Sequence, residues 1–532
     1  MLQFLFASQA AAEDLRNWTL SQTLKPPIDY WGIYGRTVAV SSTTPRRLVV
    51  AASWDNYKDI QANGVDNKTS IAPGNLYVYE YDSINKSWIL MPNMPINATD
   101  DENTHIYNLG STAVISNDGN RIVAGAPYTD VKNSDGSYIN EVGAVVVFDY
   151  DKSSSKWKQQ AILYKHNPLK NDGTNLNYDE GQGLGRSLTA TPDCKIIASA
   201  YYNKPGFLAK DQGVVFVTKQ KADDTWTDLT PIYPATVYKD INITNRYFKF
   251  GADLHFQDAS HLIIGTYVWK GKDSRNNNAP IAFEKDFGTV IMINTNDEWK
   301  VDKIIPVPDP PEGKTFDFYG TPVSMPLTSQ KILGISGGFS DKNNSFYVYE
   351  NSGSEWKTAQ IIENAGDNSW QSAGFCDDSV FYTLQSNRPR YDGNPGTVAY
   401  MTMFRKDSDG KYVKAEEFEG KSYSEGENNN FGSAITWTTD CASLIIGSMS
   451  KNMTGPKMKT HTPWGGSETL VYSIKSNDDD ELNDGLTKGQ KIGIGVGVAL
   501  AVIIIIVIIV VIIMLRNNKK KDNKESGSGT NV

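Results

Sequence analysis

The chain has 532 residues and a formal net charge of −9, with 39% hydrophobic and 11% aromatic side chains. This composition is typical of a turn-rich globular protein and excludes an intrinsically disordered chain. Residues 516–532 contain five basic and two acidic side chains and carry +3, so the remainder carries −12, which argues against nucleic acid or heparin as a partner.

The chain begins with a segment that we interpret as a short signal peptide. Residues 1–12 (MLQFLFASQAAA) have a short apolar core and small residues before Glu13, although no positive charge precedes the core. Export would make Asn-X-Ser/Thr sequons available for glycosylation. The candidates are Asn17, Asn67, Asn85, Asn97, Asn242, Asn343 and Asn452.

A tryptophan then recurs along the chain at intervals of 56 to 73 residues. Self-similarity with a period of this size indicates a repeat architecture. We therefore predict one large repetitive domain over residues 16–475. The repeated positions are Trp18, Trp88, Trp157, Trp226, Trp299 and Trp356, with Tyr412 in the seventh register.

The second repeat shows what each unit contains. Residues 111–116 and 121–126 are short apolar runs separated by an Asn-Asp-Gly-Asn turn, which is a tight hairpin signal. Residues 143–150 are a third apolar run, and residues 157–163 alternate as a half-exposed outer strand should. Seven such units predict an all-β fold, a seven-bladed β-propeller. The first strands begin near Gly35, Gly110, Gly185, Gly251, Gly320, Gly374 and Gly432.

The two ends of this domain are complementary. The last repeat supplies three strand segments but no tryptophan strand, and Trp18–Leu24 is a surplus tryptophan strand at the start. We predict that the N-terminal strand completes the last blade beside the three C-terminal strands, because this pairs an otherwise exposed edge.

The C-terminal part predicts a membrane anchor. Residues 492–515 contain no charge over 24 positions, which is long enough for a helix to span a bilayer. An acidic juxtamembrane linker, 476–491, precedes this transmembrane helix and the basic cytoplasmic tail, 516–532, follows it. The positive-inside rule then predicts a single-pass plasma-membrane protein with an extracellular N-terminus. Gly493 and Gly497 would permit lateral helix association or act as a hinge.

The repeats resemble the FG-GAP repeat of integrin alpha-chain propellers and related surface proteins. Residues 109–127 read LGSTAVISNDGNRIVAGAP and residues 143–148 read GAVVVF, and Phe250-Gly251 and Phe431-Gly432 are further matches. The resemblance covers about residues 18–474 and implies a β-propeller surface protein that acts in cell adhesion. The fifth repeat, with Gly337-Gly338, is similar to a kelch repeat, so another propeller type stays open.

The resemblance would also imply calcium, but the integrin-type loops are absent. Turns such as residues 117–120 offer one carboxylate, too few for calcium. Asp130, Asn133 and Asp135 form a looser set in another loop and are a weaker metal candidate. We therefore predict no metal and no cofactor.

The three cysteines do not indicate a disulfide framework. Cys194 and Cys441 occupy matching places in the third and seventh repeats, which are not neighbours in a seven-fold ring. We expect no disulfide between them, and small buried side chains instead.

The long polar segments follow the second and fourth strands of each repeat, so they share one face of the domain. Binding residues usually lie on loops held by a rigid scaffold. Aromatic residues recur just past the second strand, and we predict that they stack on a ligand, the alternative being that they pack neighbouring loops together. These residues are Trp54, Tyr128, Tyr201, Tyr202, Tyr267 and Trp269.

No catalytic signature accompanies these aromatic residues. None of the five histidines (His105, His166, His255, His261 and His461) has a recognisable nucleophile or metal partner. The sequence thus predicts a cell-surface adhesion or recognition protein, not an enzyme, that binds an extracellular protein or glycan, by analogy of fold. The competing interpretation is a membrane-tethered, carbohydrate-active, glycosidase-like enzyme, because paired carboxylates cannot be seen in a sequence.

Overall fold

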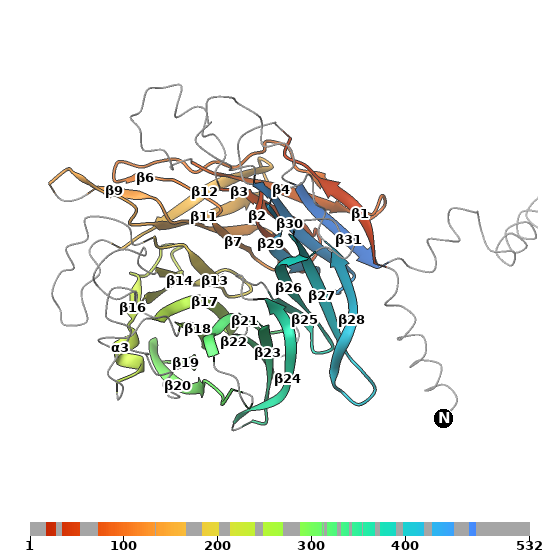
Figure 1. The fold of residues 1–532 in the computed structure, drawn as a ribbon. Helices are drawn as coiled ribbons and strands as arrows, with labels where there is room; N and C mark the ends of the chain where they lie inside the picture. The colour runs from red at the N-terminus through yellow and green to blue at the C-terminus, as the bar shows by residue number, and fades with distance from the viewer. Residues whose placement is uncertain are drawn as a thin grey trace, which may run out of the picture. The chain divides into compact units, whose positions relative to one another are not determined.

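The computed structural model describes residues 18–474 apart from 28–33, 54–72, 133–134, 166–182, 202–212, 240–247, 270–287, 311, 313–315, 327–330, 340–342, 354, 368–372, 390–396, 420–427 and 452–467. Figure 1 shows that this part of the chain is built from β-strands. Its only helix is α3 (Pro234–Val237). The predicted all-β class is confirmed.

The strands form small antiparallel sheets, named here by the sequence repeat that supplies their first strand. Repeat 1 gives β2 (Tyr34–Val40), β3 (Arg47–Ala52), β4 (Asn75–Asp82) and β5 (Ser87–Leu90). Repeat 2 gives β7 (Thr112–Ile115), β8 (Arg121–Ala126), β11 (Ala144–Asp151) and β12 (Lys156–Leu163). Repeat 3 gives β13 (Ser187–Ala190), β14 (Ile196–Tyr201), β15 (Val214–Lys219) and β16 (Thr230–Ile232).

Repeats 4 and 5 merge into one eight-stranded sheet, because β18 also pairs with β21. Repeat 4 gives β17 (Phe248–Asp258), β18 (His261–Trp269), β19 (Gly288–Thr295) and β20 (Glu298–Pro306). Repeat 5 gives β21 (Phe316–Ser324), β22 (Ile332–Phe339), β23 (Asn343–Asn351) and β24 (Trp356–Asp367). Repeat 6 gives β25 (Ala373–Asp377), β26 (Val380–Pro389), β27 (Thr397–Lys406) and β28 (Tyr412–Glu419).

The last sheet joins the two ends of the described chain. Repeat 7 supplies β29 (Asn428–Trp437), β30 (Ser443–Lys451) and β31 (Glu468–Ile474). The N-terminal strand β1 (Trp18–Leu24) lies beside β31, so the sheet has the order β1-β31-β30-β29. The Ser21 hydroxyl donates to the Val471 carbonyl at 3.0 Å. The predicted pairing of the N-terminal strand is confirmed.

The core lies between the sheets of consecutive repeats. Val49 and Leu76 of repeat 1 pack with Ala124 and Val146 of repeat 2 in one buried cluster. Trp88, 4% exposed, belongs to one of these clusters, and the half-buried Trp157, Trp226, Trp299 and Trp356 pack against others. Trp18, 9% exposed, meets the ring of Trp437 edge to face. The prediction of the recurring tryptophans as scaffold is confirmed in this part of the chain.

A glycine near the start of most first strands has a left-handed backbone. Gly110 has φ of +84°, and a Cβ atom there would lie 2.7 Å from the Ala51 Cβ of the preceding repeat. Only glycine combines this φ with so close an approach. The register of β2 with β3 and of β29 with β30 shifts at the equivalent Gly35 and Gly432. The glycine pattern of the sequence therefore marks β-bulges.

The cysteines differ from the sequence prediction. Cys376 of β25 forms a disulfide with Cys441, in the turn between β29 and β30, so neither is an isolated buried side chain. The two segments belong to consecutive repeats that pack together, which the sequence spacing of 65 residues does not reveal. Cys194 is free and buried, as expected, and desolvation raises the pKa of its thiol to about 12.

Several predicted features fall outside the described residues. These are the signal peptide (1–12), the linker (476–491), the membrane span (492–515) with Gly493 and Gly497, the tail (516–532), and the sequons at Asn17, Asn67, Asn242 and Asn452. Within the described residues, no helix has the length and apolarity needed to cross a membrane. Asn85 and Asn97 are exposed, and Asn343 begins β23.

Candidate functional site

The predicted aromatic ligand site is not seen as one cluster among the described residues. Tyr201 is 5% exposed and stacks on Phe216, so it belongs to the core of repeat 3. Tyr267 and Tyr128 are half-buried, and Tyr128 lies under the Arg186 guanidinium at 5.1 Å. The backbone of Trp269 pairs with Phe318. Trp54 and Tyr202 lie outside the described residues.

Two of the long loops, residues 91–111 and residues 127–143 apart from 133–134, contain a small sheet of their own. It contains β6 (Thr104–His105), β9 (Asp130–Lys132) and β10 (Tyr138–Ile139), with β9 in the middle. The first strand precedes repeat 2, and the other two follow its second strand. Thr104 and Val131, which are both fully buried, pair across the sheet. This pairing fixes His105 opposite Asp130.

His105 is the centre of a polar and aromatic cluster on this sheet. Its Nδ1 lies 3.1 Å from Asp100 Oδ2, and the side chains are 39% and 49% exposed. The His105 ring stacks on Tyr138 with a centroid distance of 4.4 Å and an interplanar angle of 22°. Tyr138 is itself 37% exposed. A histidine–carboxylate pair therefore lies beside an aromatic surface that solvent can reach.

Local turn chemistry holds Asp100 in place. Its Oδ1 accepts the Ile106 N–H at 2.8 Å while its Oδ2 faces the histidine. Asp101 Oδ1 accepts the Asn103 N–H and the Thr104 hydroxyl, each at 2.8 Å. Short polar side chains of this kind bond to the backbone two or three residues on and define turns. The carboxylate and the imidazole are thus oriented before any ligand arrives.

Tyr107 and Asp130 complete the cluster. The rings of His105 and Tyr107 have centroids 6.5 Å apart. Desolvation and the carboxylates of Asp130 and Asp100 raise the pKa of Tyr107, so its phenol stays protonated and remains a hydrogen-bond donor. Asp130 is 7% exposed and accepts the Glu141 N–H at 2.9 Å.

The candidate metal ligands serve as turn and loop acceptors. Asp135 Oδ1 accepts the N–H and the hydroxyl of Ser137, at 2.9 and 2.5 Å. Asp130 lies in β9, and Asn133 is outside the described residues. Across the ranges given above, no three His, Cys, Asp or Glu side chains are grouped as a metal site would need.

Sequence reasoning named His105 but missed its partners. The available signal was the acidic run Asp100-Asp101-Glu102, which ends three positions before the histidine. Tyr138 lies 33 positions further on and reaches His105 only because β9 pairs with both β6 and β10. His261 and Asp258 form a second close histidine–carboxylate pair, at 2.9 Å, where β17 ends and β18 begins.

No family model matches the chain, and no characterised protein matches it by sequence. Among solved structures, a protein of Bacteroides uniformis provisionally assigned as a 6-phosphogluconolactonase is 10% identical, with 74% of this chain and 90% of that chain covered and a TM-score of 0.40. The periplasmic gluconolactonase of Pseudomonas aeruginosa is 12% identical, with coverage of 75% and 95% and a TM-score of 0.38. Sqt1 of Saccharomyces cerevisiae is 9% identical, with coverage of 86% and 100% and a TM-score of 0.40.

These comparisons correct the family resemblance. The FG-GAP and integrin assignment is wrong, because no family model matches and the solved structures found are described as gluconolactonases and Sqt1. The physical reason is that bulge glycines, short apolar strands and an aromatic outer strand are what stacked four-stranded sheets require, whatever their family. The predicted adhesion function depended on that resemblance, so it is wrong as well.

Proposed function

We propose that this chain is a carbohydrate-active hydrolase whose reaction takes place at the cluster of His105, Asp100, Tyr107 and Tyr138. The observation that carries the proposal is the Asp100–His105 pair at 3.1 Å beside the stacked ring of Tyr138. A sugar ring presents an apolar face that an aromatic ring can cover, and hydroxyl groups that polar side chains can bind. Both requirements are met within one small sheet.

The pair favours hydrolysis of an acyl group of a sugar, such as a lactone or an ester. Asp100 accepts the Nδ1 proton of His105, which leaves Nε2 free to act as a general base. That nitrogen removes a proton from a water molecule, and the water oxygen forms a bond to the carbonyl carbon. The bond from this carbon to the ring or ester oxygen then breaks, and the histidine returns the proton to that oxygen.

Tyr107 is suited to stabilise this reaction. Desolvation, together with the two neighbouring carboxylates, raises the pKa of Tyr107 and keeps its phenol protonated, so the O–H can donate to the oxyanion that develops on the carbonyl oxygen. Cleavage of a glycosidic bond normally uses two carboxylates as acid and base or nucleophile. Here Asp100 is bonded to the histidine and Asp130 is almost fully buried, so acyl hydrolysis is the better fit.

The proposed scaffold is a seven-bladed propeller, with each repeat as one blade. The first strands support this, because β2, β7, β13, β17, β21, β25 and β29 each contact the next, and β29 also contacts β2. The sheet that joins β1 to β31 supports closure between the two ends of the described chain. The long loops after the second and fourth strands would then share one face, and His105 would lie on it.

The proposal is tested by incubating the protein with sugar lactones and O-acetylated monosaccharides. A pH-stat titration measures the acid that their hydrolysis releases. His105→Gln should lower kcat/KM by about 10²–10⁴-fold, because it removes the general base. Tyr138→Ala should mainly raise KM, because the ring binds ground state and transition state alike. His261→Gln is the matched control, because it breaks a similar histidine–aspartate pair elsewhere and should leave the rate unchanged. An equal loss in both histidine variants, or no hydrolysis by the wild type, would overturn the assignment.

A further inference from the structure

The space between repeats 1 and 2 is filled by an arginine. Arg47 begins β3, and its side chain is 5% exposed. The guanidinium donates to the Gly119 carbonyl of the next repeat at 2.9 Å, and to Glu80 of its own repeat at 3.1 Å. It also lies 4.0 Å above the ring of Tyr150. The planar guanidinium thus fills the space between two consecutive sheets, which is called a seam below.

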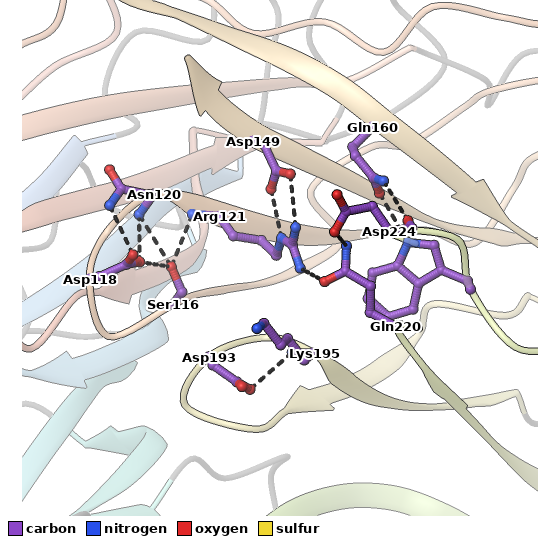
Figure 2. Close-up of polar contacts among 11 residues, drawn as sticks. Ser116, Asp118, Asn120, Arg121, Asp149, Gln160, Asp193, Lys195, Gln220 and Asp224 are labelled. Atoms are coloured by element: carbon purple, nitrogen blue, oxygen red, sulfur yellow. Dashed lines mark hydrogen bonds and ion pairs between the residues drawn. The ribbon is translucent and has the colours of Figure 1, made fainter. Parts of the chain in front are cut away.

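An arginine also fills the space between repeats 2 and 3, and Figure 2 shows its polar contacts. Arg121 begins β8 and donates to both oxygens of Asp149, at 2.6 and 2.8 Å. Its remaining Nη1 crosses to Gln220 of repeat 3 at 2.6 Å. The guanidinium is 5.9 Å from the ring of Trp226, the tryptophan of that repeat. Charge, hydrogen bonds and an aromatic face again converge on one arginine.

The third seam, between repeats 3 and 4, lacks the arginine. Ile196 stands in its place: the Ile196 N–H donates to the hydroxyl of Thr191 just as the Arg121 N–H donates to the hydroxyl of Ser116. The acidic partner has changed as well. Arg121 pairs with Asp149 across the sheet, whereas Ile196 pairs with Lys219. A cavity of about 750 Å³ opens here, beside Ile196, Lys219, Gln220, Lys221, Asn294 and Trp299.

The lining indicates what this cavity binds. Trp299 is half-buried against the core and offers an aromatic wall, and the half-buried Asn294 offers an amide. The carboxylate that holds a cation in the two preceding seams is replaced by a lysine, which disfavours a cation. Lys219 Nζ lies 3.2 Å from Asp297 Oδ1, and the side chains are 56% and 81% exposed. Such an exposed ion pair is weak, so an anionic ligand can replace Asp297 as the partner of Lys219.

We propose that the cavity between repeats 3 and 4, called here the seam pocket, binds a small acidic saccharide. Its sugar ring would lie against Trp299, and its carboxylate or phosphate would bind Lys219 and Lys221. The lining comes from short turns (Lys221 after β15, Ser260 between β17 and β18, Asp297 between β19 and β20), which lie at the opposite strand ends from the long loops. The inference is independent of the His105 site.

Isothermal titration calorimetry with glucuronate, glucose 6-phosphate and glucose tests this site. The wild type should bind one or both acidic sugars at least tenfold more tightly than glucose. The acidic sugar with the higher affinity shows whether the site prefers a carboxylate or a phosphate. Lys219→Met with Lys221→Met should abolish that preference. The exposed Lys195, which neighbours the cavity without lining it, gives the matched control, and Lys195→Met should change affinity less than twofold.

A second variant fills the cavity. Ile196→Arg combined with Lys219→Asp recreates the Arg121–Asp149 arrangement, so it should abolish binding while the protein keeps its melting temperature. His105→Gln should leave this binding intact, which separates the seam pocket from the proposed catalytic site. Equal affinity for glucose and the acidic sugars, no binding by the wild type, or unchanged binding in the filled variant would each overturn the inference.

Discussion

At the scale of single residues, two side chains of β17 have clearly shifted pKa values. Desolvation lowers the pKa of His255 to about 4 and raises the pKa of Asp253 to about 6. Asp253 accepts the Val323 N–H of the next repeat at 2.9 Å, so it links repeats 4 and 5. The two side chains are two positions apart, and each is disfavoured in its charged form. They should therefore give opposite dependences of stability on pH.

His255 makes the fold sensitive to acid. The unfolded chain protonates this histidine below its ordinary value of 6.5, whereas the folded chain resists protonation down to about pH 4. The stabilisation is thus complete above pH 6.5 and is lost as the pH falls toward 4. The free energy of unfolding in urea can be compared at pH 7 and at pH 4.5. On this decrease in pH, the His255→Gln variant should lose about 1–2 kcal/mol less of that free energy than the wild type loses.

Asp253→Asn provides the comparison of opposite sign. The folded pKa of Asp253 exceeds its ordinary value of 3.8, so its contribution is complete below that value and is lost as the pH rises to about 6. As the pH rises through this window, the Asp253→Asn variant should therefore become more stable relative to the wild type. A His255→Gln variant with the same pH profile as the wild type would contradict the assignment.

At the scale of the element, the first strand of most repeats depends on a glycine with a left-handed backbone. Gly110 sits between repeats 1 and 2, and a Cβ atom there would lie 2.7 Å from Ala51 Cβ and 2.9 Å from Leu76 Cδ2. Gly136 has a similar φ of +88°, but a Cβ atom there would meet nothing within 4 Å. These two glycines separate the cost of the left-handed backbone from the cost of close packing.

Gly110→Ala should destabilise the protein by about 2–4 kcal/mol, since it adds overpacking to backbone strain. Gly136→Ala should cost about 1 kcal/mol, from backbone strain alone. Chemical denaturation of both variants measures the difference. Equal losses would show that the close approach of the two sheets at Gly110 is not what requires glycine.

At the scale of the whole molecule, the sequence predicted the scaffold better than the site. The order of the four strands within each repeat and the pairing of Trp18–Leu24 with β31 follow from periodicity, because each repeat must bury the same faces. The Cys376–Cys441 disulfide and the contact of His105 with Tyr138 were missed, since they join positions that only neighbouring sheets or loops bring together. The FG-GAP resemblance failed because its motif reflects the packing of small antiparallel sheets, which proteins of different families share.

The most direct test of the central claim is a crystal structure of the His105→Gln variant with a sugar lactone or acetylated sugar that the wild type hydrolyses. We predict that the sugar ring lies against Tyr138, with its carbonyl carbon near residue 105 and its carbonyl oxygen within hydrogen-bond distance of the Tyr107 hydroxyl. A substrate bound elsewhere, with the surface around Asp100 and Tyr138 empty, would contradict the account.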